Sequence, residues 1–158
     1  MKLLAVIVGK CASFLLRLMH HGGSLPGKLA MRIYPKLFSF FHISCDIIVI
    51  TGTNGKTSTS NMIADLFALQ HPHVISNRKG DNLKEGIATT LLNAASLSGN
   101  IKADIIVLET DELNVAYIMA HLPVTHLVIT NFFRDQLDRS QEMEQLIHKI
   151  ETAISSFE

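Results

Sequence analysis

One stretch of the sequence decides the fold: DIIVITGTNGKT, residues 46–57. Its first half is a β-branched apolar run, which is typical of a strand buried on both faces. Two glycines follow, and from Thr57 to Gln70 helical spacing places Met62, Ile63, Leu66 and Phe67 on one apolar face. The stretch therefore predicts a strand, a tight loop and a helix in direct succession.

The loop between this strand and this helix has the composition of a phosphate site. Gly52 and Gly55 let successive backbone N–H groups point inward, and the next helix adds its positive N-terminal end. Lys56 is placed to reach terminal phosphates and Thr57 to offer its hydroxyl to Mg²⁺, as in the Walker A pattern. That pattern also has a glycine where this chain has Ile50. The alternative is a glycine-rich turn with a solvated lysine.

A cluster of acids follows a second apolar strand, expected over residues 103–108. Ligands of open parallel sheets collect at the carboxyl ends of strands. Glu109 is therefore expected to face Thr57 and complete the shell of Mg²⁺, an ion held by one or two carboxylates with phosphates and water. Asp111 and Glu112 could cap the next helix, and a helix N-terminus carrying all three acids is the alternative interpretation.

Strands and helices alternate along the rest of the chain. Further strands are expected at 73–76 and 125–130, and helices around 87–95, 115–121 and 143–154. This alternation predicts an α/β fold with a P-loop-type, mostly parallel sheet flanked by helices. We expect the sheet to be incomplete and to leave an apolar edge.

A helical leader, residues 1–44, precedes the nucleotide-binding domain expected over 45–158. Its first helix is amphipathic, with one apolar face. This face consists of Val8, Cys11, Ala12, Leu15, Leu18 and Met19. The face could dock on the domain core or on a membrane surface. Lys10 and Arg17 interrupt the apolar run, so no transmembrane helix is expected.

The amino-acid composition argues against several classes of protein and of binding site. Of the 158 residues, 47% are hydrophobic and 18% charged, which excludes a disordered chain. The formal net charge is zero, so nothing points to a nucleic-acid partner. Cys11 and Cys45 are isolated and the eight histidines show no ligand spacing, which gives no zinc or redox site and favours a reducing cytoplasm.

Several motifs together resemble a known family. The loop of residues 51–57 resembles the shortened phosphate loop of Mur ligases, in which isoleucine or valine commonly replaces the first Walker glycine. Residues 22–27, 76–83, 109–112 and 130–139 are similar to the corresponding stretches of the MurT-type branch. The resemblance covers nearly the whole chain.

This resemblance implies an ATP-dependent carbon–nitrogen ligase of peptidoglycan synthesis. Such subunits use ATP and Mg²⁺ to activate the D-glutamate α-carboxyl group of lipid II as an acyl phosphate. Ammonia from a glutaminase subunit of the GatD type then displaces phosphate, giving D-isoglutamine. The implied location is cytoplasmic, with the inner face of the membrane as a candidate position.

The family's site residues carry over by position. Nucleotide contacts fall on the loop and on three later residues, and no catalytic residue is assigned. The nucleotide set is Gly52, Thr53, Asn54, Gly55, Lys56, Thr57, Ser58, Asn82, Asn131 and Asp135; the metal set is Thr57 and Glu109. For the last three nucleotide residues, turn formation by Asn and Asp side chains is the alternative. Many Mur ligases have histidine where this chain has Gln136.

A MurT-like chain would continue with a four-cysteine zinc ribbon and a C-terminal domain, which this sequence lacks. We therefore expect the N-terminal part of a larger protein, binding nucleotide weakly and unable by itself to turn over lipid II. Two alternatives stay open. One is an amino-acid-adding Mur ligase or folylpolyglutamate synthetase, and the other is a P-loop fragment without catalysis.

Overall fold

The computed structural model describes residues 1–19, 23–78, 81–132 and 140–155. Its strands are β1 (Asp46–Thr51), β2 (Val74–Ser76), β3 (Ile105–Glu109) and β4 (His126–Ile129). Its helices are α1 (Lys2–Leu18), α2 (Leu25–Ile33), α3 (Lys56–Ala68), α4 (Lys84–Ala94), α5 (Val115–His121) and α6 (Ser140–Ser155), with 3-10 turns η1 (Leu37–Phe40) and η2 (Glu112–Asn114). The strands form one parallel sheet in the order β2-β3-β1-β4. The expected α/β fold is confirmed.

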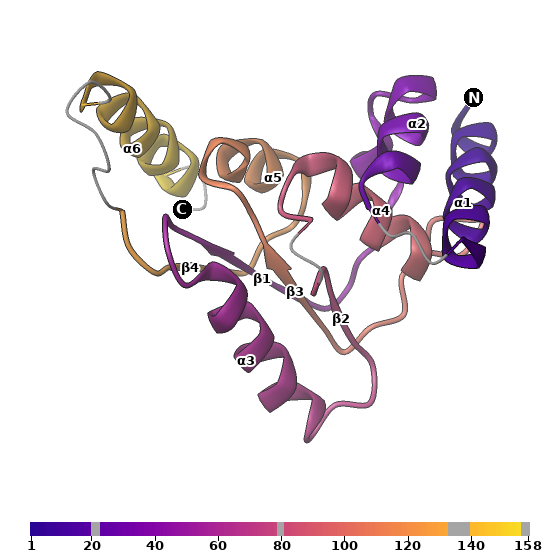
Figure 1. Ribbon diagram of the computed structural model, residues 1–158, viewed down its shortest axis with the longest axis horizontal. Helices are drawn as coiled ribbons and strands as arrows, with labels where there is room; N and C mark the ends of the chain where they lie inside the picture. The colour runs from indigo at the N-terminus through magenta and orange to yellow at the C-terminus, as the bar shows by residue number, and fades with distance from the viewer. Residues whose placement is uncertain (20–22, 79–80, 133–139, 156–158) are drawn as a thin grey trace.

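The side chains of the central strands point alternately to the two faces of the sheet, and each face has its own apolar layer. Ile48 and Ile50 of β1 pack toward α3, whereas Ile47 and Val49 belong to the larger core under α4 and α5. Figure 1 shows α3 alone on one face of the sheet and the other helices on the opposite side. Because each central strand is covered on both faces, its residues are apolar almost throughout.

The edge strand β4 is less protected than the central strands. Its residues are partly or fully exposed, with Ile129 among the exposed large apolar side chains. In the part of the chain that the structure describes, β4 pairs only with β1. No helix in that part is long and apolar enough to cross a membrane.

The face of α1 that packs on the domain is a different face from the apolar one identified in the sequence. Ala5, Val6, Gly9 and Ser13 are buried, whereas most of the large side chains of this helix face outward. A Cβ added to Gly9 would lie 2.9 Å from Leu92 Cδ1. Small side chains therefore make the close contact. Leu15, Leu18 and Met19 are exposed, so the domain core does not cover this part of the apolar face. Helical periodicity alone does not say which face of a helix has a neighbour.

A similar correction applies to α3. Met62 and Leu66, expected on its buried face, are exposed, while Ser60 and Ala64 are buried. Ile63 and Phe67 are partly buried against the β1 and β3 side chains. The helix approaches the sheet through small residues, which brings its first turn close to the strand ends.

The leader is joined to the domain where α2 crosses α4. Gly27 N–H donates a hydrogen bond to Thr89 Oγ1 at 2.9 Å, across 62 residues of sequence. A Cβ on Gly27 would clash with the Glu85 carbonyl oxygen and lie 2.8 Å from the Thr89 nitrogen. Because both are backbone atoms within α4, the clash could be relieved only by moving the helices apart.

Gly27→Ala is therefore expected to lower the free energy of unfolding by about 2 kcal/mol, in the range typical of overpacked contacts. Urea unfolding followed by circular dichroism measures this change. Lys28→Ala, one position along on the exposed side of α2, is the matched control and should stay within about 0.5 kcal/mol of the unsubstituted chain. Equal stabilities for the two variants would contradict the tight crossing.

Candidate functional site

The four strands that the structure describes end at one edge of the sheet, and each has a polar residue at its end or directly after it. β1 runs into the loop after Thr51, and β2 is followed by Asn77. β3 ends with Glu109, and β4 is followed by Thr130. Parallel strands bring these residues to one place, the edge where α/β proteins bind ligands.

The loop after β1 is fastened to the residues after β4. Asn131 makes three bonds to it: its carbonyl oxygen accepts from Thr53 N–H at 2.8 Å, its Oδ1 accepts from Asn54 N–H at 3.0 Å, and its Nδ2 donates to the Asn54 carbonyl at 3.1 Å. Thr130 Oγ1 also bonds the Asn54 carbonyl, at 2.8 Å. Asn131 therefore holds the loop in shape, and its expected contact with the nucleotide stays a prediction.

Two residues of the loop have a positive backbone φ angle, which favours glycine over other residue types. Gly52 has φ +129°, and a Cβ there would clash with Thr130 Oγ1 and lie 2.7 Å from the Asn131 carbonyl oxygen. Gly55 has φ +81° and is the N-cap of α3. Because Gly55 offers no capping side chain, the first-turn N–H groups of this 13-residue helix are available to a ligand. The loop and helix start together form an anion-binding arrangement.

Lys56 folds back over this loop. Its Nζ donates to the carbonyl oxygens of Gly52 and Thr53, the latter at 3.2 Å. It also forms an ion pair with Glu112 at 3.4 Å, and both side chains are mostly buried. The lysine thus lies at the mouth of the loop, directed toward the acidic end of β3. A strand-to-helix turn with a solvated lysine does not describe this arrangement.

Glu109 and Thr57 face each other as expected. Thr57 Oγ1 donates to Glu109 Oε1 at 3.0 Å, and Asn82 Nδ2 approaches the same oxygen at 3.4 Å. Glu109 is only 3% exposed, and its Oε2 is buried with no hydrogen-bond partner among the described residues. A buried carboxylate oxygen without a partner is costly unless a ligand or an ion satisfies it.

These donors fit a magnesium ion that is completed by phosphate and water. Mg²⁺ prefers oxygen ligands and takes few of them from the protein. Glu109 and Thr57 supply a carboxylate and a hydroxyl at one point. The described residues contain no cluster of three or more acidic, histidine or cysteine side chains, so an all-protein metal cage is not found there.

Asn77 is a structural support that the sequence did not reveal. Its Oδ1 accepts from Glu109 N–H and its Nδ2 donates to the Glu109 carbonyl, both at 2.8 Å. It also donates to the Asp81 carbonyl at 3.0 Å. A single buried amide therefore fixes the backbone of Glu109 and the loop that carries Asn82. Only its position directly after a strand could have pointed to it.

The remaining predicted residues fall in three groups. Asp111 caps η2 by accepting from Leu113 N–H, so the capping interpretation holds for this acid. Ser58 lies in the first turn of α3 and is exposed. Asp135, with its neighbour Gln136, lies outside the described residues.

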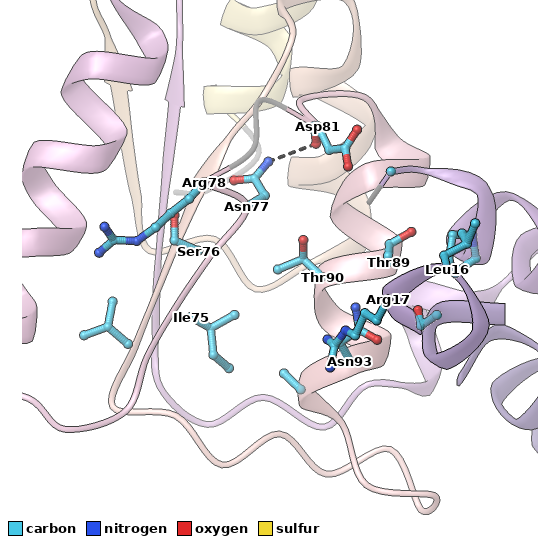
Figure 2. A pocket seen from close by; sticks show the side chains of 15 residues that line it. Leu16, Arg17, Ile75, Ser76, Asn77, Arg78, Asp81, Thr89, Thr90 and Asn93 are labelled. Atoms are coloured by element: carbon cyan, nitrogen blue, oxygen red, sulfur yellow. Dashed lines mark hydrogen bonds between the residues drawn. The ribbon is translucent and has the colours of Figure 1, made fainter. Parts of the chain in front are cut away.

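A cavity of about 590 Å³ lies beside this site, between β2, α4 and the end of α1. Figure 2 shows Asn77 at its upper rim, bonded to Asp81, and Arg17 at its lower side. Arg78 extends the other way and pairs with Asp65 of α3 at 2.6 Å. None of residues 51–57 lines the cavity, so it is separate from the phosphate loop.

The loop, its lysine and the strand-end carboxylate match one family of ligases. A profile of the Mur ligase middle domain matches residues 50–155. The chain belongs to the Mur ligase family. The resemblance of the motifs to this family is therefore confirmed, and Ile50 in place of the first Walker glycine agrees with it.

Curated Mur ligase relatives cover the chain to different extents. It is 35% identical over 151 residues to the lipid II isoglutaminyl synthase (glutamine-hydrolyzing) subunit MurT of Streptococcus pneumoniae, covering 96% of this chain and 33% of that protein. The MurT subunit of Staphylococcus aureus strain COL is 32% identical, over 85% of this chain and 30% of its own length. A UDP-N-acetylmuramate–L-alanine ligase of Pelagibacter ubique is 32% identical over 63% of this chain and 19% of its own length. The chain spans about a third of the length of these MurT relatives.

Removal of the Asn77 amide is expected to destabilise the strand ends. Asn77→Ala leaves the Glu109 N–H and carbonyl buried without partners, which should lower the free energy of unfolding by about 2 kcal/mol. Urea unfolding again measures the change. Asn93→Ala, an exposed asparagine on α4, is the control and should have little effect. A stability loss no larger than that of the control would show that Asn77 does not support Glu109.

Proposed function

We propose that this chain is the ATP-binding portion of a ligase subunit that activates the D-glutamate α-carboxyl of lipid II as an acyl phosphate for amidation to D-isoglutamine. One observation carries the proposal: the preshaped loop 52–57 places Thr57 against the buried Glu109 and Lys56 against Glu112 at the same sheet edge. The similarity to MurT subunits across nearly the whole chain supports the choice of reaction.

The proposed reaction needs the charge of ATP to be neutralised and two reactants to be aligned. A substrate carboxylate oxygen would attack the γ-phosphorus, ADP would leave, and ammonia would then displace phosphate from the acyl phosphate. The loop N–H groups and the Lys56 ammonium would bind the phosphate oxygens. Thr57 and Glu109 would hold Mg²⁺, which supplies further positive charge when bound.

Several further assignments belong to this proposal. Residues 45–158 would form the front part of the ATP-binding domain, with residues 1–44 as its helical leader. Asn82 and Asp135 would border the nucleotide, together with Ser58. The name of the MurT relatives includes glutamine hydrolysis, so a glutaminase subunit of the GatD type is the proposed source of ammonia. The proposed location is the cytoplasm, at the inner face of the membrane.

An amino-acid-adding Mur ligase is the second candidate, supported by the similarity to UDP-N-acetylmuramate–L-alanine ligases. That similarity covers 63% to 76% of the chain, against 96% for the pneumococcal MurT subunit. An assay of the longer protein with lipid II, ATP and ammonium separates the two. Amidation of lipid II supports our proposal, and addition of an amino acid to a UDP-linked precursor supports the alternative.

Nucleotide binding is expected to depend on Lys56. Lys56→Ala removes the cation at the loop mouth and should weaken ATP binding in the presence of Mg²⁺ by at least about tenfold, equivalent to about 1.4 kcal/mol. Isothermal titration measures the affinity, and circular dichroism checks the fold. Lys102→Ala removes an exposed lysine elsewhere and should leave the affinity unchanged. Equal affinities for Lys56→Ala and Lys102→Ala would refute the phosphate site.

The increase in ATP affinity that Mg²⁺ produces is expected to depend on Glu109. In Glu109→Gln the neutral amide is a poor ligand for Mg²⁺, so the gain in ATP affinity on adding Mg²⁺ should largely disappear. Titrations with and without EDTA measure this gain. Glu112→Gln, which alters the partner of Lys56 instead, should keep it. A full magnesium effect in Glu109→Gln would remove this residue from the metal site.

A further inference from the structure

The outward face of α1 is an apolar stripe, on which none of the residues that the structure describes is packed. Leu4, Ile7, Cys11, Phe14 and Leu18 are all exposed and recur at helical spacing along one side. Phe14 is 69% exposed and Leu18 71%. Soluble domains normally bury such a row, and a contiguous exposed stripe marks a surface that contacts something else.

The stripe is not needed to attach α1 to the domain. The opposite face already does this through Ala5, Val6 and Gly9, with Gly9 close to Leu92 of α4. Figure 1 shows α1 at one end of the long axis of the molecule, the end opposite α6. The stripe therefore lies on an outer surface, where a large flat partner can reach it.

Charge is divided unequally between this region and the rest of the chain. Residues 1–45 contain six Lys and Arg residues and no Asp or Glu, a formal charge of +6. Residues 46–158 contain eight cationic and fourteen acidic residues, a formal charge of −6. Among the described residues, no cation of the first 45 forms an ion pair. Burial, and secondarily the nearby Arg17, lowers the pKa of Lys10.

We propose that the stripe of α1 docks on the surface of an anionic lipid bilayer, with the helix lying in the plane of the interface. Interfacial helices combine an apolar face with Lys and Arg residues and insert only to the level of the headgroups. The 17 residues of α1 extend about 25 Å at 1.5 Å per residue, which suits this position. Each cation near an anionic surface strengthens binding by roughly fivefold.

The charge favours a bilayer over a second copy of this chain. Two α1 stripes facing each other would bring two groups of cations together without any acid from the same segment, and like charges oppose such a contact. Anionic headgroups instead supply the missing opposite charge along the whole helix. The inference does not rest on nucleotide binding, because α1 contributes no residue to the phosphate loop.

Co-sedimentation of the full chain with lipid vesicles tests the inference. The vesicles contain either phosphatidylcholine alone or phosphatidylcholine mixed with phosphatidylglycerol. The double variant Phe14→Gln/Leu18→Gln should bind the mixed vesicles at least about tenfold more weakly, because it loses apolar insertion. The matched control Leu69→Gln/Leu113→Gln changes two leucines that are each 80% exposed elsewhere, and it should bind as the unsubstituted chain does.

A second variant separates charge from apolar contact. Lys10→Gln/Arg17→Gln keeps the stripe and should lose the preference for phosphatidylglycerol, and added salt should have the same effect on the unsubstituted chain. The proposal is overturned if the chain ignores mixed vesicles, binds both kinds equally, or binds unchanged after the Phe14 and Leu18 substitutions. It is also overturned if sedimentation velocity shows a dimer that the stripe variant loses and no vesicle binding is seen.

Discussion

The candidate site depends on one constraint, the hydrogen bonds that hold the loop after β1 to the residues that follow β4. Asn131 bonds the loop at three points and Thr130 at a fourth, so residues 52–54 cannot relax into an extended chain. This contact joins residues 77 positions apart, which makes the loop shape a product of the whole sheet. A loop that is ordered before ligand arrives avoids much of the conformational entropy cost of binding. The strand order places β4 beside β1 and so makes this fastening possible.

The same sheet holds a buried carboxylate beside the loop. Glu109 ends the central strand β3, and the Asn77 amide fixes its backbone on both sides. One oxygen of its side chain accepts from Thr57, while the other has no partner among the described residues. A buried oxygen without a hydrogen-bond partner lowers the stability of the fold. Such groups are found at functional sites, where a bound ligand or ion supplies the missing partner. The ion pair between Lys56 and Glu112 would also change when a ligand binds, because phosphate would compete with Glu112 for the Lys56 ammonium group.

The order of elements and the glycine-containing loop after β1 could be predicted from local patterns, because β-branched runs, glycines and helical spacing act over a few residues. Glu109 could be placed because parallel strands end at one edge. The roles of Asn77 and Thr130 could not be predicted, because their hydrogen-bond partners lie 32 and 76 residues away in the sequence. The buried residues of α1 and α3 could not be identified from the sequence pattern either. In both helices small residues make the tight contact, and a periodicity of large apolar residues cannot identify such a face.

The exposed stripe of α1 follows from the same packing rule. Gly9 and Ala5 let the helix approach α2 and α4 so closely that larger residues on that side would be excluded. The large apolar residues therefore occupy the opposite side, where they contribute nothing to the domain core. A helix that served only to cover the core would gain stability from the reverse arrangement, with its large residues inward. Positive charge confined to the same segment, and compensated only by acids elsewhere in the chain, gives this outward face a preference for anionic surfaces. Attachment through small residues thus leaves the large ones free for a second contact.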